Sequence, residues 1–162
     1  MDTSLAVELG ELLRERGLTL ALAESCTGGL IGDRITNVAG SSDYFLGAIV
    51  SYAIDAKINL LGVSDDTLNE HGAVSAQTVK EMAHGARHVL GADIGLSVSG
   101  IAGPGGGTTV KPVGLVWFGL SAEDGSWTQE KRFHGDRIEV KNKSADEALR
   151  FLLSYLQGQL YD

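Results

Sequence analysis

Short apolar runs of strand length alternate with stretches of helical period along this 162-residue chain, and this alternation constrains the fold more than any other feature. Strands are predicted over residues 18–23, 45–52 and 94–98, with helix-like segments between them. Parallel strands need long crossover connections, which are usually helices. The pattern therefore predicts an α/β protein with helices on both faces of a sheet.

The last third of the chain follows a different pattern. Residues 115–120 and 127–133 flank Glu123-Asp124-Gly125-Ser126, a sequence typical of a β-hairpin turn. Two antiparallel strands are expected to close the sheet there. We therefore predict a three-layer α/β/α sandwich with a mixed sheet of about five strands, in a single domain over residues 1–162 without linkers or internal repeats.

Residues typical of helix N-caps and C-caps predict where the helices begin and end. The first is predicted from Thr3 or Ser4 to Gly17, and two short ones over residues 30–35 and 54–61. A longer helix is predicted from Ser75 to Gly91, with an inner face of Val79, Met82, Ala83, Ala86 and Val89. The last is expected after Asp136, with an apolar face of Ile138, Ala145, Leu149, Leu152, Leu153 and Leu156.

The composition indicates in which cellular compartment the protein is expected to work and which partners it is expected to lack. The chain has one cysteine, so a disulfide framework is excluded and a reducing compartment is expected. A net charge of -8 argues against broad binding to nucleic acids or anionic membranes. Neither a signal-peptide pattern nor an apolar run of roughly 20 residues is present, so we expect a cytoplasmic protein that does not associate with membranes.

The first candidate for chemistry is the turn that follows the first strand. Ser25 lies there between a strand and a helix, where the backbone N–H groups of Gly28 and Gly29 would face a developing negative charge. This arrangement suits a serine nucleophile beside an oxyanion site. Two alternatives stay open: the segment is an ordinary capped turn, or Cys26 is the nucleophile or a buried apolar residue.

Lys57 is the candidate base. Tyr52 ends the second strand, and Lys57 follows one helical turn later, so both are expected at the carboxyl edge of the sheet, where open α/β proteins bind ligands. A desolvated lysine can lose its proton near neutral pH and deprotonate a serine, directly or through the tyrosine hydroxyl. The alternative is a solvated helix lysine.

Residues 100–114 contain six glycines and both prolines of the chain, so they are predicted to form a loop. Its backbone donors, its hydroxyls and Lys111 suit a phosphate or a polar substrate, and a plain surface connection is the alternative. His84 and His88 have the i,i+4 spacing of a metal pair, but no glutamate follows His84 as in a His-Glu-x-x-His motif, so a solvated helix face is expected and we predict no metal.

Positive charge is concentrated late in the chain. Residues 131–150 contain six basic residues against four acids, whereas residues 1–130 contain seven against sixteen. This segment is a candidate rim for an anionic substrate, with Arg137 closest to it. The alternative is an exposed helix with i,i+4 ion pairs such as Lys143 with Glu147.

Several motifs, taken in order, resemble the CinA C-terminal domain family over nearly the whole chain. They are Ala23-Glu24-Ser25-Cys26-Thr27-Gly28-Gly29, Gly40-Ser41-Ser42, Tyr52 with Lys57, His71-Gly72-Ala73-Val74-Ser75, Ser99-Gly100-Ile101-Ala102-Gly103-Pro104 and Lys111-Pro112-Val113-Gly114. The resemblance implies a three-layer fold, often dimeric, and a nicotinamide-nucleotide amidase that releases ammonia from nicotinamide mononucleotide without metal or redox cofactor.

The family's functional positions carry over residue by residue. The resemblance implies Ser25 as nucleophile, Tyr52 and Lys57 as the base, and Ser99 as a further catalytic hydroxyl. The residues expected to hold the oxyanion or the nucleotide are Thr27, Gly28, Gly29, Gly103, Gly106, Thr108, Lys111 and Arg137. The alternative function is a non-catalytic nucleotide-binding module that acts in competence or DNA-damage responses.

Overall fold

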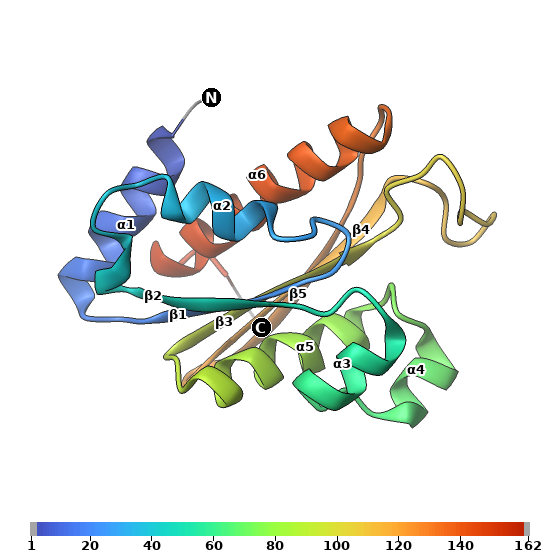
Figure 1. Cartoon of the computed structure of the whole chain (residues 1–162), viewed down its shortest axis with the longest axis horizontal. Helices are drawn as coiled ribbons and strands as arrows, with labels where there is room; N and C mark the ends of the chain where they lie inside the picture. Colours follow the sequence, from blue (N-terminus) through green and yellow to red (C-terminus); the bar gives the residue numbers. More distant parts are fainter. Residues whose placement is uncertain (1–2, 161–162) are drawn as a thin grey trace.

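A five-stranded mixed sheet lies between two layers of helices in the computed structural model, which describes residues 3–160 (Figure 1). The strand order is β2-β1-β3-β4-β5; β1 pairs in parallel with β2 and β3, and β4 pairs antiparallel with β3 and β5. The predicted three-layer fold is confirmed. The elements are α1 (Ser4–Arg16), β1 (Leu20–Glu24), α2 (Leu30–Thr36), the 3-10 helix η1 (Ser41–Asp43), β2 (Phe45–Val50), α3 (Ile54–Leu61), α4 (Asp65–His71), α5 (Ala76–Leu90), β3 (Ile94–Gly100), β4 (Leu115–Ala122), β5 (Gly125–Arg132) and α6 (Arg137–Leu156).

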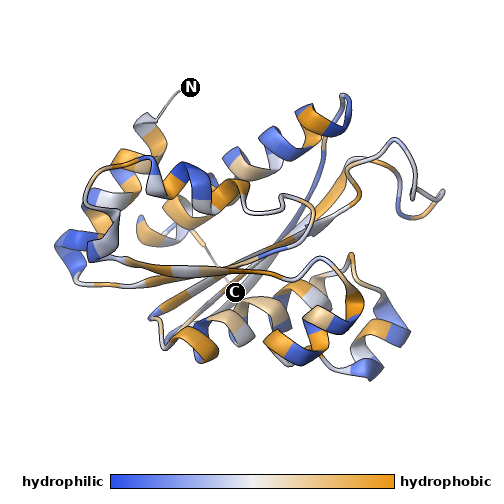
Figure 2. Ribbon diagram, viewed as in Figure 1, coloured by the Kyte–Doolittle hydropathy of each residue, from blue (hydrophilic) through white to orange (hydrophobic). Residues whose placement is uncertain are grey.

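The two faces of the sheet have separate cores. Helices α1, α2 and α6 cover one face, and α3, α4 and α5 cover the other (Figure 1). Strand side chains alternate between faces, so in β1 Leu20 and Leu22 join the first core while Ala21 and Ala23 join the second. Figure 2 shows hydrophobic and hydrophilic residues alternating around the outer helices, as expected where each buries one side.

Helix α5 packs unusually close to the sheet because glycines face it. A Cβ atom added to Gly95 in β3 would lie 2.0 Å from the Ala83 carbonyl oxygen, and one at Gly119 in β4 would lie 2.4 Å from the Val79 carbonyl oxygen. These distances leave no space for a side chain. The close approach holds the start of α5, and with it Ala73 and Val74, against the carboxyl ends of the strands.

Helix α4 was not predicted from the sequence. It is seven residues long and buries no side chain, so it has no apolar stripe to reveal it. Its signals are the Ser64 side chain, which accepts a hydrogen bond from the Thr67 N–H, and Gly72 at its end.

Two core assignments were wrong. Val89 is 57% exposed because it lies in the last turn of α5, on the side away from the sheet. Ile138 is 63% exposed because the first turn of α6 extends past the packed region, and burial begins at Val140. The predicted caps at Ser75 and Asp136 are confirmed: each side chain accepts a backbone N–H of its helix, whereas Thr3 makes no such bond.

None of the helices formed by residues 3–160 is both long and apolar enough to cross a bilayer.

Candidate active site

A cavity of about 200 Å³ lies at the carboxyl edge of the parallel strands. The chain reaches it from the ends of β1 and β3, from the segment after β2, and from the beginnings of α5 and α6. Its walls are formed by Ser25, Cys26, Tyr52, Ile54, Lys57, Ala73, Val74, Ser99, Gly100, Ala102 and Arg137. Open α/β sheets bind ligands at this edge because strand ends and helix starts converge there.

The centre of the cavity is a direct contact between Ser25 and Lys57. The Lys57 Nζ atom lies 2.9 Å from the Ser25 Oγ atom, although the two residues are 32 positions apart. Lys57 is 1% exposed and Ser25 is 7% exposed. The position of Ser25 is fixed by its backbone N–H, which donates to the Val98 carbonyl at 3.1 Å. Lys57 is therefore not the solvated helix lysine of the alternative prediction.

Burial shifts Lys57 toward its neutral form. Burial lowers the pKa of the Lys57 amine from its ordinary value, and no carboxylate bonds to it. Its Nζ atom donates to the carbonyl oxygens of Ser51 at 2.7 Å and Tyr52 at 3.2 Å. These two bonds use both N–H groups of a neutral amine. In the charged amine a third N–H donates to Ser25 Oγ, and in the neutral amine the lone pair takes that place and can accept the Ser25 hydroxyl proton.

Glu24 shapes the turn that presents Ser25. This residue ends β1, is fully buried, and accepts the Thr27 hydroxyl at 2.7 Å. Its carboxylate also accepts the N–H groups of Gly29, Ile31 and Gly32 at 3.0–3.2 Å, so it caps the start of α2. The predicted substrate residue Thr27 is buried against Glu24 and does not line the cavity.

The expected oxyanion donors are corrected by the same bonds. The Gly29 N–H is taken by Glu24, and the Gly28 N–H donates to the Ser25 carbonyl at 3.1 Å, so neither is free for a ligand. In the described part of the chain, the N–H groups of Cys26 and Thr27 have no acceptor on another residue, and the Cys26 N–H faces its own thiol. The sequence pointed to the two glycines and so missed the donors on Cys26 and Thr27. Gly28 and Gly29 have positive φ, and the turn they make directs their own N–H groups inward.

Cys26 does not compete with Ser25. Burial raises the pKa of the Cys26 thiol to about 12, and the positive charges of Lys57 and Lys141 offset this only in part. The thiol therefore stays protonated near neutral pH and is a poor nucleophile.

Tyr52 lies apart from the proton path that its position suggested. Its side chain is 62% exposed, and its hydroxyl accepts a hydrogen bond from Arg137 Nη2 at 3.1 Å. Arg137 Nη1 donates to the Gly103 carbonyl at 2.7 Å, so one guanidinium joins the segment after β2 to the glycine-rich loop. Tyr52 touches Lys57 through its backbone carbonyl alone.

Of the other predicted site residues, some line the cavity and some lie away from it. Ser99 lies in the cavity wall, and its hydroxyl donates to the Ala73 carbonyl at 2.8 Å. Thr108 and Lys111 bond to each other in an exposed turn of the loop, and the Lys111 amine donates to the His71 carbonyl. Neither Gly106, Thr108 nor Lys111 lines the cavity, so the far part of this loop is fastened to α4 and does not reach Ser25.

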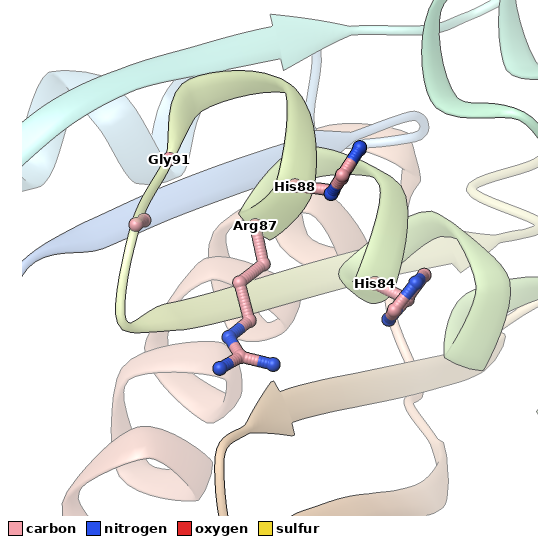
Figure 3. A pocket seen from close by; sticks show the side chains of 5 residues that line it. His84, Arg87, His88 and Gly91 are labelled. Carbon is pink, nitrogen blue, oxygen red and sulfur yellow. The ribbon is translucent and has the colours of Figure 1, made fainter.

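A larger depression of about 340 Å³ lies at the end of α5, at the opposite edge of the sheet (Figure 3). His84, Arg87, His88, Gly91 and Ala92 form it, and the two imidazole rings stack with centroids 6.4 Å apart. Among the described residues, no group of three or more His, Cys, Asp or Glu side chains is arranged to hold a metal.

The fold and the cavity define an α/β protein with a buried serine–lysine pair at the carboxyl edge of its sheet. The chain belongs to the CinA C-terminal domain family, which it matches over residues 2–156. It is 51% identical over 150 residues to "Nicotinamide-nucleotide amidohydrolase PncC" of Enterobacter agglomerans, covering 92% of each chain.

Other relatives have less specific names. The chain is 54% identical over 157 residues to a "Putative competence-damage inducible protein" of Halothermothrix orenii, covering 96% of this chain but 38% of that one. It thus spans well under half the length of that relative. The crystal structure of a competence/damage-inducible protein from Agrobacterium tumefaciens is 41% identical with a TM-score of 0.92, covering 96% of this chain and 94% of that one.

Proposed function

We propose that this chain hydrolyses the carboxamide of nicotinamide mononucleotide to nicotinate mononucleotide and ammonia, with Ser25 as nucleophile and Lys57 as base. The observation that carries this proposal is the 2.9 Å contact between the Lys57 amine and the Ser25 hydroxyl, with the other N–H groups of the amine held by carbonyls. The printed name of the Enterobacter relative supports the choice of substrate. The family resemblance supports a homodimer in the cytoplasm, which stays a prediction.

The chemistry follows from these positions. Ser25 Oγ attacks the carboxamide carbon and its proton passes to Lys57 Nζ, giving a tetrahedral oxyanion. The C–N bond then breaks, and Lys57 returns the proton to the departing nitrogen, which leaves as ammonia. Water attacks the resulting ester, Lys57 takes one proton from that water and returns it to Ser25 Oγ, and the carboxylic acid product leaves and loses its remaining proton to solvent. Every proton is returned, so the hydrolysis needs no cofactor.

Two further groups complete the site. The free N–H groups of Cys26 and Thr27 would stabilise the oxyanion, at roughly 3 kcal/mol for each well-placed donor. Ser99 donates its proton to a backbone carbonyl, so the lone pairs of its hydroxyl remain for the N–H groups of the substrate amide. Tyr52 and Arg137 would bound the mouth of the cavity.

The test is ammonia release from nicotinamide mononucleotide by the wild type, Ser25→Ala and Lys57→Met, with Ser42→Ala as the matched control on an exposed serine. We expect release by the wild type and the control and none above background by the two site variants. A wild type that binds the nucleotide in calorimetry without releasing ammonia would contradict the proposal. That result would favour the nucleotide-binding module instead.

A further inference from the structure

His84 and His88 are exposed histidines on successive turns of α5, and neither lines the cavity at Ser25. Their imidazole rings are stacked, with centroids 6.4 Å apart and planes inclined by 7°. Figure 3 shows both side chains projecting from the helix beside the depression that they help to form. Neither ring makes a hydrogen bond or an ion pair with a residue between 3 and 160, so the ring nitrogens are open to a ligand.

The part of α5 that carries the two histidines is held rigidly. A Cβ atom added to Gly85 would lie 1.9 Å from the Leu61 carbonyl oxygen at the end of α3. The Ala83 carbonyl oxygen lies equally close, at 2.0 Å, to a Cβ atom built on Gly95 in β3. The helix is thus fixed between α3 and the sheet. A rigid helix keeps residues i and i+4 side by side, so a ligand that joins them does not have to order the backbone.

The charged neighbours of the two histidines are bonded elsewhere. Arg87 Nε donates to the Asp93 carbonyl at 3.0 Å. The Glu81 carboxylate, one turn before His84, accepts the Ser64 N–H at 3.0 Å. The described chain holds no set of three His, Cys, Asp or Glu side chains suited to a metal ion. The ligands that it offers at this place are therefore the two imidazoles.

Ligand type decides which ions such a pair can bind. Imidazole nitrogen suits Zn²⁺, Ni²⁺ and Cu²⁺, whereas Mg²⁺ and Ca²⁺ prefer oxygen. Metal–nitrogen bonds of about 2.0–2.1 Å place two bonded nitrogens about 3–4 Å apart. Exposed side chains rotate freely between rotamers, so these two rings reach that separation without movement of the backbone. The depression of about 340 Å³ beside them leaves room for water at the remaining coordination positions.

We infer that His84 and His88 bind one transition-metal ion of the Zn²⁺, Ni²⁺ or Cu²⁺ class, with water completing the coordination. This inference is independent of the proposed function. The sequence predicted a solvated helix face because the glutamate of the His-Glu-x-x-His motif is missing. In that motif the two histidines are the ligands and the glutamate is the general base of hydrolysis, so its absence removes the catalysis and not the binding.

The experiment is calorimetric titration of the full chain, prepared without a histidine tag, with Ni²⁺, with Zn²⁺ and with Mg²⁺ in separate runs. The proteins are the wild type, His84→Ala and His88→Ala. The matched control is His134→Ala, which removes an exposed histidine that has no second histidine one turn away. Thermal unfolding followed by circular dichroism, with and without Ni²⁺, shows that each variant folds and gives a second readout of binding.

We expect one Ni²⁺ or Zn²⁺ per wild-type chain and no measurable binding of Mg²⁺. Loss of either histidine should weaken the affinity roughly tenfold or more, because the remaining imidazole no longer acts in a chelate. Ni²⁺ should raise the melting temperature of the wild type and of His134→Ala, and not that of the other two variants, since the ion binds the folded pair.

Three results would overturn the inference. One is a wild type that shows no saturable binding of Ni²⁺ or Zn²⁺. Another is wild-type affinity in His84→Ala or in His88→Ala, which would mean that a single histidine binds the ion adventitiously. The third is an equal loss of affinity in His134→Ala, which would place the ion elsewhere.

Discussion

Replacing Glu24 by glutamine tests whether this carboxylate holds together the turn that presents Ser25. The wild-type side chain accepts four hydrogen bonds: Oε1 takes Thr27, Gly29 and Ile31, and Oε2 takes the Gly32 N–H at 3.0 Å. Glutamine has the same shape, but one of its two terminal groups is an NH₂ donor. With its oxygen placed at the Oε1 position, the amide nitrogen faces the Gly32 N–H, so a donor meets a donor.

The magnitude follows from the lost contacts. A buried N–H that loses its charged acceptor costs about 2 kcal/mol. Removing a negative charge from the start of α2 adds about 1 kcal/mol. Together, about 3 kcal/mol corresponds to a melting temperature lowered by roughly 6–12 °C for a chain of this length. Because the turn also carries Ser25 and the free N–H groups, ammonia release is expected to fall at least tenfold at temperatures where the variant is folded.

The assay is thermal unfolding followed by circular dichroism, with ammonia release measured well below both melting temperatures. The matched control is Asp33→Asn, which removes an exposed negative charge from the same first turn of α2 and is expected to cost at most about 1 kcal/mol, since no buried N–H loses its acceptor. Equal melting temperatures for Glu24→Gln and the control would show that the carboxylate does not hold this turn, and the reasoning would be refuted.

Three further predictions concern packing and protonation. Gly95→Ala should lower the free energy of unfolding by about 3 kcal/mol in urea, because the added Cβ would lie 2.0 Å from a carbonyl oxygen. The control Gly105→Ala, with no atom within 4 Å of its Cβ, should leave the stability unchanged. Similar urea midpoints for the two variants would contradict the packing argument. If the neutral Lys57 amine is the base, as proposed, kcat/KM should rise with pH. Burial should put the midpoint below the ordinary pKa of 10.5, and a midpoint at or above 10.5 would exclude this role. Cys26 is buried and its thiol has a pKa raised to about 12, so iodoacetamide at pH 8 should label the denatured chain and leave the folded chain nearly unlabelled. Rapid labelling of the folded chain would contradict the burial of this thiol.

Much of the fold was predictable because its signals are local. The apolar run of β1, the cap residues Ser75 and Asp136 and the hairpin turn at Gly125 depend on backbone preferences and periodicity within a few residues. Helix α4 escaped prediction because it buries nothing, and Ile138 was misassigned because periodicity does not reveal where a helix extends past its sheet.

The site was predictable in its residues more than in their contacts. The motif around Ser25 and the spacing of Tyr52 and Lys57 predicted that these residues meet at the carboxyl edge of the sheet, and there they line one cavity. The sequence could not reveal that Gly28 and Gly29 use their N–H groups inside the turn, nor that the Tyr52 hydroxyl meets Arg137. Both depend on side-chain directions that arise only when distant segments pack.

By itself the sequence determined the three-layer order of elements, the turn that presents Ser25 and the family. Only the tertiary structure decided that the Lys57 amine reaches Ser25 across 32 residues and that the Tyr52 hydroxyl meets Arg137. The physical reason is burial. Packing of α3 and α5 on the sheet removes water from Lys57 and so lowers the pKa of its amine, which the sequence alone does not reveal.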